Sequence, residues 1–232
     1  MALAKIMKEK RPGFSEQEVL RLAKAAYSEN PTFTVDRKRT ALLVIDMQDE
    51  FVKPHWTPYW VPQATRIAKD VRSLVDYCRS RGVPIIYTAF ARTHRYLDRP
   101  KSGGLMPNRY EGKVPGDPSY FRNGKIWHEL APRKDDVVIF KPSYGAFYDT
   151  PLESVLKNLG KDTVIICGTL TNFCCGTTAR QAYERGFQVI VGSDVTATDD
   201  PQMHEAELKT LRKGFGMVLT SSEITEKLES GR

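Results

Sequence analysis

The feature that most constrains the fold is a series of short, continuously apolar runs separated by segments with helical periodicity. Such runs are typical of strands in a parallel sheet that helices cover on both faces. The first is "ALLVI" at 41–45, and the others are "VPIIYTAF" at 83–90, "DVVIF" at 136–140, "TVIICG" at 163–168, "QVIVGSD" at 188–194 and "GMVLT" at 216–220. Strand and helix alternate along the chain, which predicts an α/β fold with a parallel sheet.

The intervening segments carry the apolar stripes of amphipathic helices. The clearest lies in "QATRIAKDVRSLVDYCRSRG" at 63–82, where one helical face collects Ile67, Val71, Leu74, Val75 and Cys78. We predict further helices at 150–160, 172–185 and 202–213. For the first of these, Thr150 and Glu153 suggest a capping box around Pro151.

Two segments fall outside this alternation. Residues 1–38 form an N-terminal extension, in which Ser15 and Glu18 predict a capped helix over 15–28. Its thin apolar stripe suggests packing on the domain or on a neighbouring subunit. Residues 91–133 are rich in Arg, Pro, Gly and Tyr without any period, which is typical of a functional loop or lid. Residues 39–232 are predicted to form the main domain.

The apolar runs, the cysteine count and the net charge indicate in which compartment and with which partners the protein works. No apolar run reaches the about 18–20 residues that span a bilayer, and the charged N-terminus lacks a signal peptide's apolar core, so we expect a cytoplasmic protein without membrane contact. Four cysteines in 232 residues are too sparse for a disulfide scaffold. The net charge of +7 is spread along the chain. This even spread favours a solvated basic surface over a nucleic-acid-binding patch. The alternative is that the basic residues attract an anionic substrate.

Three chemically capable side chains follow different predicted strands. Asp46 follows the first strand, Lys141 the third and Cys174 the fourth. Because the carboxyl ends of parallel strands share one edge, we expect them to converge. A structural cap for Asp46 and a surface position for Lys141 are the alternatives. Together, a cation that favours the thiolate and a carboxylate that accepts the thiol proton suit nucleophilic catalysis.

Of the two adjacent cysteines, Cys174 is the better candidate for a reactive thiol. If Thr171 and Asn172 cap the following helix, Cys174 lies in its first turn, where the helix N-terminus lowers a thiol pKa and offers N–H groups to an oxyanion. Cys175 lies about 100° further round the helix. The remaining thiols are predicted to be core packing: Cys175, Cys78 and Cys167.

Three stretches resemble the isochorismatase-like hydrolase superfamily, in particular its cysteine-hydrolase branch. They are "LLVIDMQDEF", "IFKPSYGAFYDTPLESVL" and "ICGTLTNFCCGTTARQAYERGFQVIVGSD", and the resemblance covers about residues 39–222. It implies a Rossmann-like three-layer α/β/α sandwich. It also implies that Asp46 is the general base, Lys141 its cationic partner and Cys174 the nucleophile. The backbone N–H groups of Leu170 and Cys174 would form the oxyanion hole, after a cis Thr169–Leu170 peptide bond.

The same resemblance implies an activity. Members of this branch cleave a C–N bond of a small amide, ureide or carbamoyl compound through a thioester and release ammonia or an amine. Phe90 and Arg92 occupy the places of the Asp-x-His metal motif of nicotinamidases, so we expect no metal and no other cofactor. True isochorismatases resemble this chain but lack the cysteine, which favours C–N hydrolysis. A vinyl ether hydrolase and a non-catalytic binding protein are the alternatives.

Substrate contacts are less defined by the sequence. Aromatic residues near the predicted edge are candidate pocket walls, with core packing as the alternative: Phe51, Trp56, Tyr59, Tyr144 and Phe147. Arg92 could hold a substrate carboxylate, although a surface arginine is equally compatible with the sequence. The family resemblance also implies a homodimer or homotetramer and a small-molecule substrate.

Overall fold

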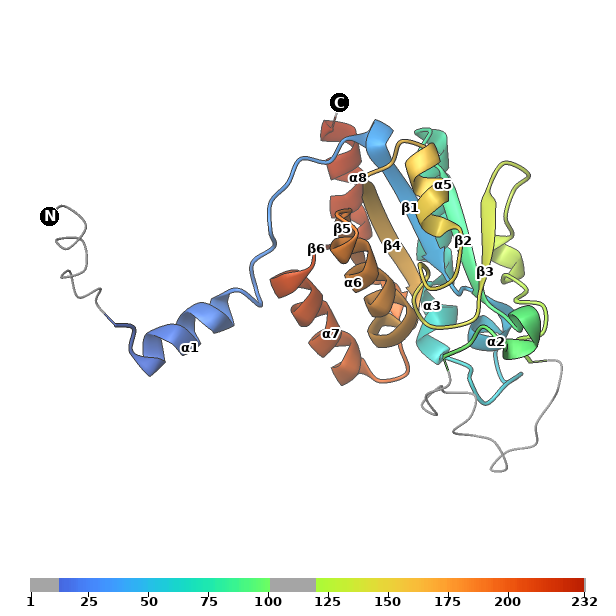
Figure 1. The fold of residues 1–232 in the computed structure, drawn as a ribbon, viewed down its shortest axis with the longest axis horizontal. Helices are drawn as coiled ribbons and strands as arrows, with labels where there is room; N and C mark the ends of the chain where they lie inside the picture. Colours follow the sequence, from blue (N-terminus) through green and yellow to red (C-terminus); the bar gives the residue numbers. More distant parts are fainter. Residues whose placement is uncertain (1–12, 101–119, 232) are drawn as a thin grey trace, which may run out of the picture.

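The computed structural model describes residues 13–100 and 120–231, which contain a central parallel sheet of six strands (Figure 1). In chain order these are β1 Thr40–Ile45, β2 Ile85–Phe90, β3 Val137–Lys141, β4 Thr163–Thr169, β5 Gln188–Ala197 and β6 Met217–Leu219. Their spatial order is β3-β2-β1-β4-β5-β6, and every neighbouring pair is parallel. The order reverses between β1 and β4. In open sheets such a switch point leaves a crevice at the carboxyl ends.

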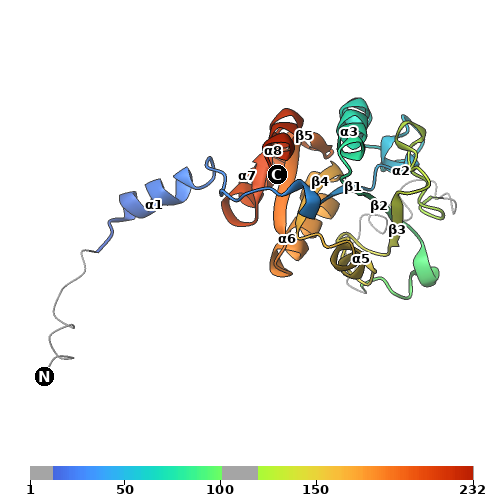
Figure 2. The same ribbon diagram turned by 90° about the horizontal axis from the view of Figure 1, so that it is seen from above.

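Helices cover both faces of the sheet (Figure 2). On one face lie α3 Pro62–Ser80 and α8 Ser221–Ser230, and on the other lie α5 Leu152–Asn158, α6 Gly176–Glu184 and α7 Pro201–Gly214. Alternate residues of β1 divide between the two cores: Leu42 and Val44 join the cluster with α3, whereas Leu43 and Ile45 join the cluster with α6. Burial on both faces explains the continuous apolar runs and confirms the predicted three-layer α/β/α fold.

Part of the predicted irregular segment is tied to the edge of the sheet. Residues 101–119 lie outside the described residues, but the chain returns at 120 and runs beside α2 Asp49–Val52. The Asp49 N–H donates to the Lys125 carbonyl at 2.8 Å, and the Trp127 N–H donates to the Met47 carbonyl at 2.9 Å. Residues 120–131 are therefore held against the strand end that carries Asp46.

Two helix ends differ from the sequence-based predictions. The capping box predicted at Thr150 does not form, because Pro151 is the N-cap and the Glu153 carboxylate pairs with Lys157 and Arg185 instead. Conversely, α8 was not predicted, although Thr220 and Glu223 form a complete capping box at its start. Its T-x-x-E signature was therefore readable in the sequence.

The N-terminal extension contains α1 Glu16–Ala25, most of which stands away from the body in both views (Figures 1 and 2). Its last turn contacts α7, where Lys213 Nζ donates to the Ala23 carbonyl at 3.2 Å. The predicted capping box between Ser15 and Glu18 is present, but no residue of α1 is buried. The segment after it is anchored by Asn30, whose side chain bonds both the N–H and the C=O of Val218 at the edge of β6. No helix within residues 13–100 and 120–231 combines the length and the apolarity needed to cross a membrane.

Candidate active site

The structure brings Asp46, Lys141 and Cys174 together at the carboxyl edge of the sheet. Asp46 directly follows β1, Lys141 ends β3 and Cys174 lies in the turn that follows β4. The switch point between β1 and β4 places the carboxylate and the thiol on either side of one crevice. The Lys141 ammonium reaches Asp46 from the far side of β2, passing 5.5 Å from the ring of Phe90.

The Asp46 carboxylate is fixed by its own backbone and by the neighbouring strand. Its φ of 48° lies in the left-handed region, which aspartate tolerates better than most residues. The Asp46 N–H donates to the Thr88 carbonyl at 3.1 Å, and the Thr88 hydroxyl donates to Oδ1 at 2.9 Å. Oδ2 faces the Lys141 ammonium at 2.7 Å. The carboxylate is fully buried, so this pairing offsets its lost hydration.

The Lys141 ammonium is surrounded by three oxygen atoms. Besides Asp46, it donates to the carbonyl of Ser143 at 2.8 Å and to that of Tyr144 at 2.9 Å. Complete burial alone would lower the pKa of Lys141, but Asp46 and Cys174 together outweigh burial and raise it. Lys141 therefore remains a cation inside the protein.

The turn that carries Cys174 differs in detail from the predicted capped helix. Thr171–Cys175 form a π-helical turn that leads into α6, after a cis Thr169–Leu170 peptide bond as the resemblance implied. The side chains expected to cap it point elsewhere. The Thr171 hydroxyl bonds His204 Nδ1 at 2.9 Å, and Asn172 Oδ1 accepts from the Thr198 hydroxyl at 2.6 Å. These bonds tie the turn to α7 and to the end of β5.

The thiol of Cys174 is protonated at rest. Burial raises its pKa to about 12. Lys141 opposes this shift, the Asp46 carboxylate reinforces it, and the Leu170 N–H directed at the sulfur lowers the pKa slightly. The sequence-based expectation of a thiol pKa lowered by a helix N-terminus is therefore wrong, because desolvation dominates. The site holds a neutral thiol beside a buried ion pair, and Asp46 is the acceptor within reach of its proton.

A model of the Isochorismatase domain matches residues 40–223, which includes all three of these side chains. The chain belongs to the isochorismatase family. Nicotinamidase 3 of Arabidopsis thaliana is 33% identical over 193 residues, which cover 82% of this chain and 89% of that protein. This relative lies in the same family as the chain.

Solved structures of the family have the same fold. A cysteine hydrolase from Pseudomonas syringae pv. phaseolicola 1448A superposes with a TM-score of 0.76 at 29% identity, covering 88% of this chain and 98% of that one. N-carbamoylsarcosine amidase from Thermoplasma acidophilum superposes with a TM-score of 0.61 at 26% identity, covering 79% of this chain and 96% of that one. The chain is thus an isochorismatase-family hydrolase similar to cysteine hydrolases.

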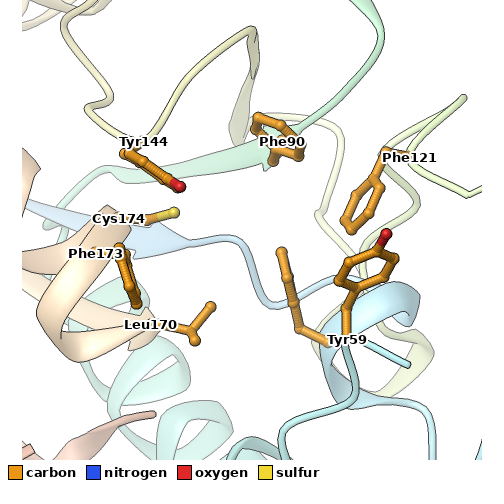
Figure 3. Close-up of a pocket in the computed structure, with 8 residues that line it drawn as sticks. Tyr59, Phe90, Phe121, Tyr144, Leu170, Phe173 and Cys174 are labelled. Atoms are coloured by element: carbon orange, nitrogen blue, oxygen red, sulfur yellow. The ribbon is translucent and has the colours of Figure 1, made fainter. Parts of the chain in front are cut away.

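In this isochorismatase-family protein, the Cys174 sulfur faces a narrow aromatic pocket (Figure 3). Tyr144, Phe173 and Leu170 lie beside the thiol, and Tyr59 and Phe121 lie across the cavity from it. The described lining consists of Phe51, Tyr59, Phe90, Phe121, Tyr144, Leu170, Phe173 and Cys174. The cavity measures about 20 Å³, which is room for about one water molecule.

Three of the six predicted substrate-binding residues belong to this lining, namely Phe51, Tyr59 and Tyr144. The other three lie outside it. Phe147 packs on Phe187 in the core beneath α5 and α6. The Trp56 ring meets the Tyr120 edge at 5.5 Å, and the Arg92 side chain is exposed. Their contact with substrate stays a prediction.

Sequence reasoning missed three of the aromatic walls. Phe90 ends β2 and Phe173 precedes the candidate nucleophile, so both positions at the sheet edge could have been inferred. Phe121 lies in the segment without periodicity, where no sequence signal pointed to the pocket. Tyr59 and Tyr144 likewise lie in loops that fold back over the sheet.

His94 and His55, two histidines of the loops near this edge of the sheet, each contact another side chain. His94 Nδ1 lies 2.9 Å from Asp98 Oδ2, and the His55 ring packs on Trp60 at 4.4 Å. Across residues 13–100 and 120–231, no group of three or more His, Cys, Asp or Glu side chains is arranged to hold a metal ion.

Proposed function

We propose that this protein is a cysteine amidohydrolase that cleaves a C–N bond of a small amide, ureide or carbamoyl compound. The observation that carries the proposal is the buried Asp46–Lys141 ion pair beside a thiol that faces a pocket. Perturbed titratable groups that lie together beside a pocket are typical of catalytic sites, which favours an enzyme over a binding protein.

The first half-reaction forms a thioester. Asp46 takes the proton of Cys174 as the sulfur attacks the carbonyl carbon, because a thiol with a pKa of about 12 is a poor nucleophile until it is deprotonated. The backbone N–H groups of Leu170 and Cys174 stabilise the oxyanion of the tetrahedral intermediate. As that intermediate collapses, the C–N bond breaks and Asp46 returns the proton to the departing amine.

The second half-reaction hydrolyses the thioester. Asp46 removes a proton from water, the resulting hydroxide adds to the acyl carbon, and the C–S bond breaks. The proton then returns to the sulfur. Lys141 stays charged throughout and holds the Asp46 carboxylate in place. One amide and one water yield one acid and one amine or ammonia, and the enzyme returns to its resting state.

An ammonia-release screen with simple carboxamides, ureides and carbamoyl amino acids tests this proposal. We expect turnover of at least one class, abolished in Cys174→Ala and retained in Cys175→Ala, whose parent thiol is outside the described lining of the pocket. A Cys174→Ala variant that released ammonia at the full rate would contradict the thioester route. Inactivity on all three classes would favour vinyl ether hydrolysis or a binding role.

A further inference from the structure

A second buried carboxylate, Glu50 on α2, lies close to the pocket without belonging to the Asp46–Lys141–Cys174 site. Its residue is only 3% exposed. Within residues 13–100 and 120–231, no cation lies within ion-pair distance of it. An unpaired carboxylate is costly to bury, so its hydrogen bonds must hold it in place.

Both oxygens of Glu50 accept hydrogen bonds from fixed donors. Oε1 accepts from the Phe121 backbone N–H at 2.8 Å, and Oε2 accepts from Gln48 Nε2 at 2.7 Å. The Gln48 amide is itself fixed, because its Oε1 accepts from the Phe90 N–H at 2.8 Å and its Nε2 donates to the Phe90 carbonyl at 3.0 Å. The carboxylate thus connects the end of β2 to the segment that starts at residue 120.

Phe121 depends on this connection. Its φ of 59° lies in the left-handed region, which is unfavourable for a bulky residue. Its N–H is held by Glu50, and its carbonyl accepts from the Arg92 N–H at 2.8 Å. The Phe121 ring contacts three other walls of the pocket, with centroid distances of 5.4 Å to Phe51, 5.0 Å to Tyr59 and 5.2 Å to Phe90.

The backbone of Glu50 supports a second wall. Its carbonyl accepts from the Thr57 hydroxyl at 2.6 Å, and that hydroxyl accepts from the Tyr59 N–H at 3.1 Å. Tyr59 and Phe121, which face Cys174 across the cavity in Figure 3, are therefore both anchored through one residue.

We propose that Glu50 is a positioning residue that fixes Phe121 and Tyr59 opposite Cys174 and so limits the size of the groups that reach the thiol. A cavity of about 20 Å³ admits no ring unless a wall moves. The hydrogen bonds of Glu50 resist that movement at Phe121, the wall whose backbone φ is unfavourable. This role does not depend on which bond the enzyme hydrolyses.

Alkylation of Cys174 tests the role without any substrate. The rate constants for iodoacetamide and for N-phenyliodoacetamide are measured by mass spectrometry, and their ratio reports how strongly the pocket excludes a ring. In Glu50→Gln, the new NH₂ group must face one of the two donors, either the Phe121 N–H or Gln48 Nε2. The Gln48 amide cannot turn round to accept instead, because its oxygen already accepts from the Phe90 N–H. We expect the ratio in favour of the small reagent to fall about fivefold to tenfold.

Controls separate positioning from general destabilisation. Glu205→Gln removes the same charge on the exposed face of α7 and should leave the ratio unchanged. Phe121→Ala should lower the ratio by itself, and adding Glu50→Gln should then have little further effect, because both changes act on the same wall. Glu50→Asp, which keeps the charge but cannot reach both donors, replaces Glu50→Gln if that variant does not fold.

The proposal would be overturned if folded Glu50→Gln or Glu50→Asp kept the ratio within about twofold of the native value or raised it. Fully additive effects of Glu50→Gln and Phe121→Ala would also overturn it. Neither outcome depends on ammonia release, so failure here is distinct from failure of the proposed amidohydrolase activity.

Discussion

Nζ of Lys141 lies 2.7 Å from Oδ2 of Asp46, and neither side chain has any exposed surface. Each charge is the main compensation for burying the other. This pair therefore contributes to the stability of the fold and to the chemistry of the site together, and changes to one partner should affect both.

Replacing Lys141 by Met should lower the free energy of unfolding by about 3–5 kcal/mol, because Asp46 is left as an uncompensated buried charge. Urea denaturation measures the loss. Lys209→Met, on the exposed face of α7, should change stability little. Adding Asp46→Asn to Lys141→Met should recover part of the loss. If the two effects simply added, the pair would not be coupled.

Alkylation of Cys174 by iodoacetamide should accelerate about tenfold per pH unit between about pH 7 and pH 10. The reason is that only the thiolate reacts, and burial raises the pKa of this thiol to about 12. Mass spectrometry of the labelled peptide gives the rate at each pH. A plateau near pH 9 would mean that Lys141 outweighs burial, contrary to the structure.

Stability should decline in alkali through the buried thiols. The pKa of Cys78 rises from 9.0 to about 12 on burial. The unfolded chain therefore loses this proton above about pH 9 while the folded chain keeps it, and stability falls by up to about 1.4 kcal/mol per pH unit until pH 12. Urea denaturation should show a shallower decline in Cys78→Ala. An equal slope in both proteins would refute this contribution.

Gly168→Ala should prevent folding or cost more than about 4 kcal/mol. A Cβ at this position would lie 2.0 Å from the Ile45 carbonyl oxygen, and the backbone φ is 115°. Gly82→Ala provides the control, because its φ of 72° imposes strain but no atom lies within 4 Å. Thermal melts should show a loss of about 1–2 kcal/mol for Gly82→Ala. Similar losses for both variants would rule out the clash at β1.

The exposed apolar face of α1 is proposed to contact a second copy of the chain. A ten-residue helix is marginal alone in water, and Val19, Leu20 and Leu22 are at least half exposed. Leu20→Ser with Leu22→Ser should lower the oligomeric mass in light scattering, whereas Lys24→Ser should not. A monomeric native protein would contradict this contact.

Much of the site was predictable because parallel sheets obey a simple rule. Buried strands read as apolar runs, and residues that follow them share one edge, so Asp46, Lys141 and Cys174 could be grouped before their contacts were known. The aromatic walls could be predicted only in part. Phe147 and Trp56 are aromatic residues near the predicted sheet edge, as Phe51 and Tyr59 are, yet they pack outside the described lining of the pocket.

The sequence by itself determined the fold class and the candidate reacting side chains, since apolar periodicity and the succession of strands and helices along the chain are local patterns. Only the tertiary structure decided the protonation state of Cys174 and the shape of its pocket. Desolvation depends on all the atoms that surround the sulfur, and the place of Phe121 depends on a hydrogen bond from a distant loop to Glu50. Both arise from contacts between residues far apart in the chain, which no local pattern encodes.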